Sequence, residues 1–226
     1  WSSDVCSSDL KITRSTIRTN PVPYYGIVGN NVGYIVISTF AIENCSKDIK
    51  KALIELKQQG AKSIVLDLRG NGGGLLGEAV NVVNFFVPKG KEIVVTKGKI
   101  KQAGTTYKTM NEPVDTEIPL AVLVDGSTAS ASEIVSGSLQ DLDRAIVVGS
   151  RTYGKGLVQV PRELPYNSSM KVTTAKYYIP SGRCIQAIDY AKRNADGSVA
   201  RTPDSLTNVF HTAAGREDRK STRLNS

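Results

Sequence analysis

Histidine and cysteine are scarce in this sequence. The 226 residues include one histidine, His211, and three cysteines, none of them spaced as C-x-x-C. Protein zinc sites are assembled mainly from closely spaced cysteine and histidine side chains, so the usual zinc sites are excluded. A Ser-His-Asp triad would depend on His211, which lies near the end of the chain and which we expect at the surface. If a serine is activated here, its base has to be another residue type.

Long apolar runs, concentrated charge and common hydrolase signatures are also missing. No stretch approaches the roughly 18 apolar residues of a membrane span. The net charge is +8, but lysine and arginine are scattered, which favours a solvated surface or an acidic partner and gives no support to nucleic-acid binding. The chain has no G-x-S-x-G elbow, and the S-x-x-K match at residues 168–171 lacks the K-T-G and S-D-N motifs that accompany it.

Both ends of the sequence differ in kind from its middle. Residues 1–10 and the tail from 218 onward can be written as nearly complementary DNA, as translated sequencing adapters would be. We therefore predict that residues 1–10 and 217–226 are adapter-derived and that the native segment between them is cut at both ends. Its length, about 200 residues, suits one α/β domain with a sizeable core.

Strand and helix patterns alternate along the native segment. Apolar and β-branched runs predict strands at residues 33–40, 63–68, 92–95, 120–124 and 145–148. Helices are expected between them, one capped by Ser46 and ended by Gly60, one around residues 80–86, and one from about 130 to 142. Residues 157–160 and 171–179 alternate like an antiparallel hairpin. The order predicts a layered α/β fold with a mostly parallel central sheet plus an antiparallel hairpin region.

A first candidate site is the run DGSTASASEI at residues 125–134, directly after a predicted strand. A serine in the turn that starts a helix, as Ser130 would be, lies where free amides and the positive end of the helix dipole favour an oxyanion. The alternative is structural, with Ser130 and Ser132 as N-cap and first-turn residues. This run alone favours capping, because serine at a helix start usually has that role.

A second candidate is Lys155, which stands between two glycines in the run RTYGKGLVQ at residues 151–159. Flanking glycines permit a close approach of the backbone. If the chain is extended from Lys155 to Gln159, the even spacing points both side chains to one face. The alternative is a lysine in a solvent-exposed turn.

A third candidate is the run DLRGNGGG at residues 67–74, which follows a predicted buried strand. Its glycine amides could bind an anion or an oxyanion. Gly72, Gly74 and Gly77 also fit the dinucleotide fingerprint G-x-G-x-x-G. The next predicted strand ends near Thr96, without the acidic residue that would bind a ribose, so a nucleotide site is disfavoured.

Together, the three runs resemble the C-terminal processing (tail-specific) serine peptidases. The matching motifs are residues 67–74, 128–134 and 153–156, and the serine–lysine spacing of 25 residues is the one expected of that family. The similarity covers nearly all of residues 11–216. It implies a Clp-protease/crotonase-like α/β domain, with residues 11–20 as the remnant of a preceding PDZ domain and linker, and residues 21–216 as a catalytic domain truncated at its C-terminal end.

The resemblance assigns roles to five residues. Ser130 would be the nucleophile, Lys155 the general base, and Gln159 the residue that orients the lysine amine. The amides of Ala131 and Gly74 would stabilise the oxyanion. A lysine amine has a reference pKa of about 10.4, so it can act as a base only if burial lowers that pKa. The reaction would pass through an acyl-enzyme on Ser130 and would need no metal and no organic cofactor.

The resemblance also bears on Asp141 and Gly72. Asp141 falls where some members carry a functionally important acid. It lies 11 residues from Ser130, about 16 Å along a helix at 1.5 Å per residue, so we expect a structural role. Gly72 stands where many relatives have proline, which should loosen the loop.

The resemblance also implies partners and location. Substrates would be proteins or peptides presented by their C-termini, which the PDZ domain would normally bind by strand addition. The site of action would be the bacterial cell envelope, periplasmic or extracytoplasmic, with membrane association only through a missing N-terminal segment. Two rival interpretations remain, a crotonase-like acyl-thioester enzyme and a non-catalytic binding domain on the same fold.

Overall fold

The computed structural model describes residues 13, 15, 19–99, 104–193, 195–201 and 208–218. Its helices are α1 (Cys45–Gln58), α2 (Leu76–Asn84) and α3 (Ala131–Asp141). The strands, in chain order, are β1 (Tyr24–Val28), β2 (Val32–Val36), β3 (Ser63–Asp67), β4 (Glu92–Lys97), β5 (Thr105–Lys108), β6 (Leu120–Val124), β7 (Ile146–Gly149), β8 (Leu157–Leu164), β9 (Ser168–Tyr178), β10 (Ile188–Arg193), β11 (Val199–Arg201), β12 (Phe210–His211) and β13 (Glu217–Asp218). Within these residues, no helix combines the length and the apolar character that a membrane crossing requires.

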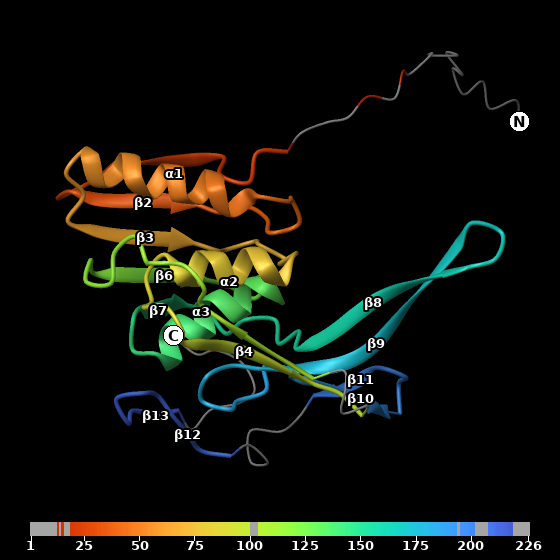
Figure 1. Cartoon of the computed structure of the whole chain (residues 1–226). Coiled ribbons are helices and arrows are strands. Elements are labelled where there is room, and N and C mark those ends of the chain that lie inside the picture. Colours follow the sequence, from red (N-terminus) through yellow and green to blue (C-terminus); the bar gives the residue numbers. More distant parts are fainter. Residues whose placement is uncertain are drawn as a thin grey trace, which may run out of the picture.

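A five-stranded sheet in the order β1-β2-β3-β6-β7 forms the centre of the molecule (Figure 1). Strands β2, β3, β6 and β7 run parallel, and only β1 is antiparallel to its neighbour. The predicted mostly parallel sheet is therefore confirmed. Since β3 and β6 both end at the same edge, the loops that follow them meet there.

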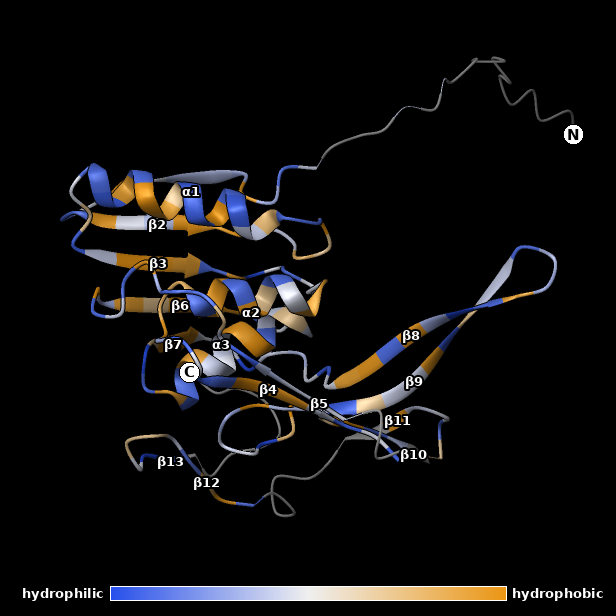
Figure 2. Ribbon diagram, viewed as in Figure 1, coloured by the Kyte–Doolittle hydropathy of each residue, from blue (hydrophilic) through white to orange (hydrophobic). Residues whose placement is uncertain are grey.

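The helices cover one face of this sheet. On that face the central strands present Ile35, Leu66 and Val122, all fully buried in one core with the apolar stripe of α1. The other face is only partly covered, and on the edge strand β7 the side chain of Ile146 is 68% exposed. Figure 2 shows the alternation of hydrophobic and hydrophilic positions along α1, as expected for a helix with one buried side.

A second, antiparallel sheet in the order β5-β4-β9-β8 lies beside the first. Its last two strands form the expected hairpin, which is longer than predicted and projects away from the body of the molecule (Figure 1). Helix α3 is tied to this sheet because the hydroxyl of Ser138 donates to the carbonyl of Ile93 at 2.9 Å. Helix α3, which starts directly after Ser130, therefore contacts both sheets.

The predicted N-cap of the first helix is wrong. Ser46 lies inside α1, and the N-cap is Asn44, in a left-handed conformation with φ 63°. The carboxylate of Glu78, far away in sequence, accepts the amides of Asn44 and Ser46 at 3.1 and 2.8 Å. A tertiary contact thus replaces the local cap.

Other sequence-based boundaries agree with the structure to within a few residues. Strands β1, β5 and β10–β13 were not predicted, and β2 ends before the predicted limit at residue 40. The predicted PDZ remnant and the two adapter-derived ends lie mostly outside the described residues, so these domain limits stay predictions.

Candidate active site

Ser130 occupies the N-cap position of α3 with φ 56° and ψ −117°. A non-glycine residue in this region costs on the order of 1–3 kcal/mol and persists only where its surroundings impose it. The residue is half-buried at the point where the chain turns from β6 into the helix. Ser130 therefore occupies the N-cap position that the structural alternative predicts. Its strained backbone indicates a role beyond capping.

The turn before Ser130 is fastened to the loop that follows β3. The carboxylate of Asp125 accepts the amide of Gly70 at 3.1 Å, and the hydroxyl of Thr128 donates to the carbonyl of Leu68 at 2.8 Å. The amide of Ala129 donates to the carbonyl of Asn71 at 3.0 Å. Burial would raise the pKa of Asp125, but the amides that donate to its carboxylate outweigh burial and lower it. The first and third candidate runs thus form one unit.

Two glycines of this loop have no room for a side chain. A Cβ on Gly73, at φ 95°, would lie 2.6 Å from the carbonyl of Ala129 and 2.8 Å from the amide of Ala131. A Cβ on Gly74, at φ 151°, would lie 2.1 Å from the backbone of Phe40. In the described part of the chain, no acceptor is bonded to the amides of Gly74 and Ala131. Both amides therefore remain available for an oxyanion, that of Ala131 directly after Ser130 and that of Gly74 next to Gly73, which packs against residues 129–131.

A buried carboxylate joins the serine turn to the lysine loop. Glu133 Oε2 accepts the amide of Ser130 at 2.9 Å and the amide of Lys155 at 2.8 Å. Glu133 Oε1 accepts the hydroxyl of Thr152 and the amide of Gly154, both at 2.7 Å. Burial raises the pKa of Glu133, while the four donors oppose this by favouring the ionised form. One side chain thereby fixes the backbones of both dyad candidates.

Glu133 and Thr152 were not singled out from the sequence. The signal for Glu133 is present, because Ser130 and Glu133 have the S-x-x-E spacing of a capping box. A capping box predicts only the bond from Glu133 to the Ser130 amide. The bonds to Thr152, Gly154 and Lys155 cross 19 to 22 residues and depend on the fold.

The side chains of Lys155 and Gln159 are exposed. No hydrogen bond joins the hydroxyl of Ser130 to the amine of Lys155 in the described structure, and Gln159 is not bonded to that amine. The surroundings of Lys155 are therefore not dry in this structure, in contrast to the burial expected of a lysine that acts as a base. The backbones of Ser130 and Lys155 are therefore held together through Glu133, whereas their side chains are not hydrogen-bonded to each other.

Gly156 confirms the expected close approach of backbone next to the lysine. A Cβ at Gly156 would lie 2.4 Å from the amide of Gln186. The Gly156 amide donates to Gln186 Oε1 at 2.7 Å, and the Gly154 carbonyl accepts the amide of Ala187 at 3.0 Å. The lysine loop is thus held on both sides.

The other polar candidates lie apart from this arrangement. Asp141 forms a buried ion pair with Arg183 at 3.0 Å and accepts the amide of Ser181, which agrees with the structural role expected of it. Ser132 is fully buried in α3, with no hydrogen-bond partner for its hydroxyl, and His211 is exposed on β12. Among the residues that the structure describes, no three histidine, cysteine or acidic side chains are grouped to hold a metal ion.

The chain is similar in sequence to known proteins. Residues 31–192 match peptidase family S41. A probable CtpA-like serine protease from Staphylococcus epidermidis is 41% identical over 180 residues, which are 78% of this chain and 35% of the relative. A carboxyl-terminal-processing protease from Picosynechococcus is 42% identical over 175 residues, 76% of this chain and 41% of the relative. The chain thus spans less than half the length of these relatives.

Solved structures agree on the fold. The photosystem II D1 C-terminal processing protease superposes with a TM-score of 0.66 at 35% identity, over 78% of this chain and 48% of that one. A putative S41 protease from Bacteroides fragilis superposes with a TM-score of 0.63 at 20% identity, over 74% of this chain and 48% of that one, and supports the fold alone. The Clp-protease-like α/β fold expected from the sequence is confirmed.

Proposed function

The chain belongs to peptidase family S41, and we propose that it is the catalytic part of a serine endopeptidase that cleaves proteins near their C-termini. The observation that carries the proposal is the shared carboxylate of Glu133, which accepts the amides of both Ser130 and Lys155. If Ser130 were only a helix cap and Lys155 only a surface residue, hydrogen bonds from both amides to one buried carboxylate would not be expected. The printed function of the carboxyl-terminal-processing relatives supports the choice of substrate.

The mechanism uses groups of this chain alone. The neutral amine of Lys155 accepts the proton of the Ser130 hydroxyl as the oxygen attacks the scissile carbonyl. The amides of Ala131 and Gly74 donate to the resulting oxyanion, and the strained turn directs the serine oxygen toward them. Lys155 then donates a proton to the leaving amine, and water hydrolyses the acyl-enzyme. Gln159 would orient the amine of Lys155 during these steps.

The proposal requires a change around Lys155. Lys155 is exposed in this structure, whereas a lysine that acts as a general base has to be shielded from water. A substrate strand bound across the serine turn would exclude water from the amine and bring it toward Ser130. We therefore propose that the dyad closes on substrate binding.

The test is cleavage of a protein substrate by the chain, followed by mass spectrometry of the products. We expect cuts close to the substrate's C-terminus that disappear in Ser130→Ala and in Lys155→Ala. The acyl-thioester and non-catalytic interpretations predict no cleavage by the unmodified chain. Cleavage that survives Ser130→Ala would reject the proposed nucleophile.

Substrate presentation and location are part of the proposal. A PDZ domain that precedes the catalytic part in the longer protein would bind substrate C-termini by strand addition. The enzyme would act in the bacterial cell envelope, outside the cytoplasm. Fractionation of cells that express the complete gene tests this, and an enzyme found only in the cytosolic fraction would overturn it.

A further inference from the structure

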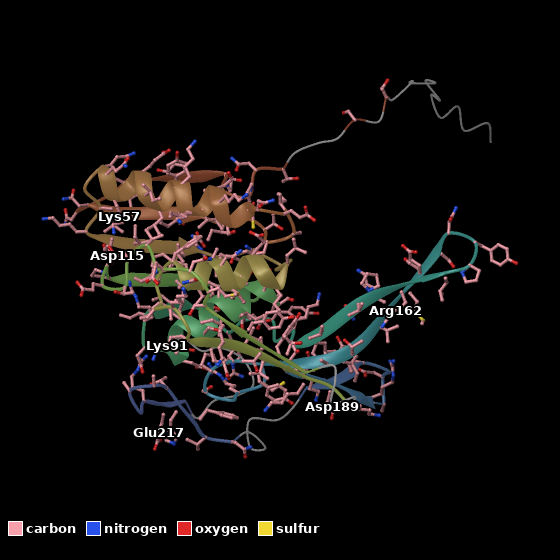
Figure 3. All side chains as sticks on the ribbon, in the orientation of Figure 1. Lys57, Lys91, Asp115, Arg162, Asp189 and Glu217 are labelled. Atoms are coloured by element: carbon pink, nitrogen blue, oxygen red, sulfur yellow. The ribbon has the colours of Figure 1, made fainter. Side chains whose placement is uncertain are left out.

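A groove of about 670 Å³ lies where the base of the β8–β9 hairpin faces β10. Its walls include Leu157 and Gln159 from β8, Thr173 and Lys176 from β9, Gln186 from the segment that leads into β10, and Asp189 from β10 itself. Figure 3 shows Asp189 at the foot of the hairpin, whereas Arg162 lies farther out along it. The groove therefore belongs to the part of the hairpin nearest the candidate active site.

At its base the β8–β9 hairpin has one face packed on the core and one face that lines the groove. Val158 and Ala175 are paired across the strands, and Val158 packs on the core while Ala175 is buried. Leu157 is paired with Lys176 and, by the alternation of strands, lies on the opposite face with it. That opposite face is the one that lines the groove.

The groove carries the positive charge of Lys176 on its hairpin wall. Lys176 is exposed, and its side-chain amine forms no ion pair or hydrogen bond within the described ranges. Lys97 of β4 is its cross-strand partner and lies with its amine 4.8 Å from the ring of Tyr178. Like charges directly opposite each other destabilise a sheet, so this pair is unfavourable unless an anion lies between them. Asp189, the acidic residue of the groove, comes from the facing wall.

The groove is connected to the lysine loop of the active site. Gln186 is buried and uses both ends of its amide, since Oε1 accepts the Gly156 amide at 2.7 Å and Nε2 donates to the carbonyl of Ile188 at 2.8 Å. Leu157, opposite Lys176, lies two residues after Lys155, about 7 Å along an extended chain. A peptide bond held between Ser130 and Lys155 would thus lie two or three residues from Lys176.

We propose that this groove binds the free C-terminal carboxylate of the substrate after a PDZ domain has released it, with Lys176 as the cation that binds it and Lys97 adding to the positive field. The inference rests on the proposed function, because the segment released by cleavage near a C-terminus ends in such a carboxylate. Asp189 on the facing wall directs the carboxylate to the Lys176 side. The position of the groove favours released segments of two or three residues.

Binding to the Ser130→Ala chain tests the proposal without depending on cleavage. The probes are a short fluorescein-labelled peptide of alanine and serine with a free C-terminal carboxylate and the same peptide amidated at its C-terminus, measured by fluorescence anisotropy. We expect the free acid to bind about fivefold more tightly than the amide, as one exposed ion pair allows. Lys176→Gln should abolish this difference. Lys171→Gln, which removes another exposed lysine from the outer part of the same strand, should retain it.

Equal binding of acid and amide, or an acid preference that survives Lys176→Gln, would overturn the proposal. A third probe, amidated but with glutamate as its last residue, separates the terminal carboxylate from a side-chain carboxylate. If it binds as tightly as the free acid, the groove does not recognise the C-terminus. An acid preference in a chain that cleaves nothing would contradict the proposed function and not the carboxylate site.

Discussion

The backbone of Ser130 combines a positive φ with a β-carbon, at a position where glycine would be free of strain. In Ser130→Gly the strain is relieved, whereas in Ser130→Ala it is retained. We expect the glycine variant to be more stable than the alanine variant by about 1 kcal/mol, although both lose the proposed nucleophile. Urea denaturation of the two variants measures this difference.

Ser132, two residues along in α3, provides the matched control. Its helical backbone has no positive φ, so the order is reversed and Ser132→Gly should be less stable than Ser132→Ala by about 1 kcal/mol. If Ser130→Gly is the less stable member of its pair as well, the conformation of Ser130 is not strained.

Glu133 is the residue on which both halves of the site depend. In Glu133→Gln an amide NH₂ replaces one carboxylate oxygen. The NH₂ group is itself a donor, so it cannot accept the two hydrogen bonds that the oxygen accepted. Leaving two buried donors unsatisfied should cost about 3 kcal/mol of stability and should also abolish serine acylation. Chemical denaturation and labelling by a peptidyl fluorophosphonate, whose peptide part takes the place of the substrate strand, measure the two effects.

Thr152→Val separates the contributions to this anchor. It removes one of the four donors to Glu133 and leaves the amides of Ser130 and Lys155 in place. We expect a smaller loss of stability than in Glu133→Gln and residual labelling. A Glu133→Gln chain that labels like the unmodified chain would show that the shared anchor is dispensable.

At the scale of elements, the glycine-rich loop after β3 is shaped by the start of α3. A methyl group at Gly73 would lie within 3 Å of Ala129, Ser130 and Ala131 and would also have to adopt φ 95°. Gly73→Ala should therefore displace the serine turn and abolish acylation, with a loss of stability of about 2 kcal/mol. Gly72→Ala is the control, since a Cβ there has open space and should change little. Comparable labelling of both variants would contradict the close packing.

Helices and strands with strong local patterns were predictable from the sequence. The buried runs of β3 and β6 and the apolar stripe of α1 follow from burial, which the residue types record directly. The cap of α1 was not predictable, because Glu78 reaches it from another helix. Strands β10–β13 escaped detection for a related reason, since their pairs are short and carry no clear alternation of apolar residues.

The residue types of the candidate site were predictable from the sequence, but the contacts of Glu133 and the exposure of Lys155 were not. Ser130 and the glycine-rich loop stand out because turns beside buried strands expose amides, and the structure does place them together. The role of Glu133 as a shared anchor depends on contacts across the fold and leaves only a capping-box spacing in the sequence. The exposure of Lys155 could not be read from the sequence either, because no pattern near it records burial.

At the scale of the whole molecule, acid stability depends on contacts such as that between Lys57 of α1 and Asp115 in the loop before β6 (Figure 3). Burial would raise the pKa of Asp115, but the bonds from Lys57 and from the amides of Ile118 and Glu117 outweigh it and lower the pKa to about 2. The folded pKa lies below the unfolded value of 3.8, so the contribution is present above about pH 4 and is lost as the pH falls toward 2.

Asp115→Asn should therefore lower stability by about 1 kcal/mol at neutral pH and by almost nothing near pH 2, since the pair is partly exposed. Thermal unfolding of both chains between these pH values measures the difference. Glu163→Gln is the control at an exposed position in the outer part of the β8–β9 hairpin, where little change is expected at any pH. A constant difference between Asp115→Asn and the unmodified chain across this range would show that the pair does not titrate with folding.

The central claim is that Ser130 is acylated with Lys155 as its base, and mapping the adduct of a peptidyl fluorophosphonate by mass spectrometry tests it most directly. The account predicts an adduct on Ser130 that is absent in Lys155→Arg, because guanidinium stays protonated, and unchanged in His211→Ala. A histidine base would instead make the adduct depend on His211 and leave it intact in Lys155→Arg. An adduct on Ser127 or Ser132, no adduct at all, or full labelling of Lys155→Arg would contradict the account.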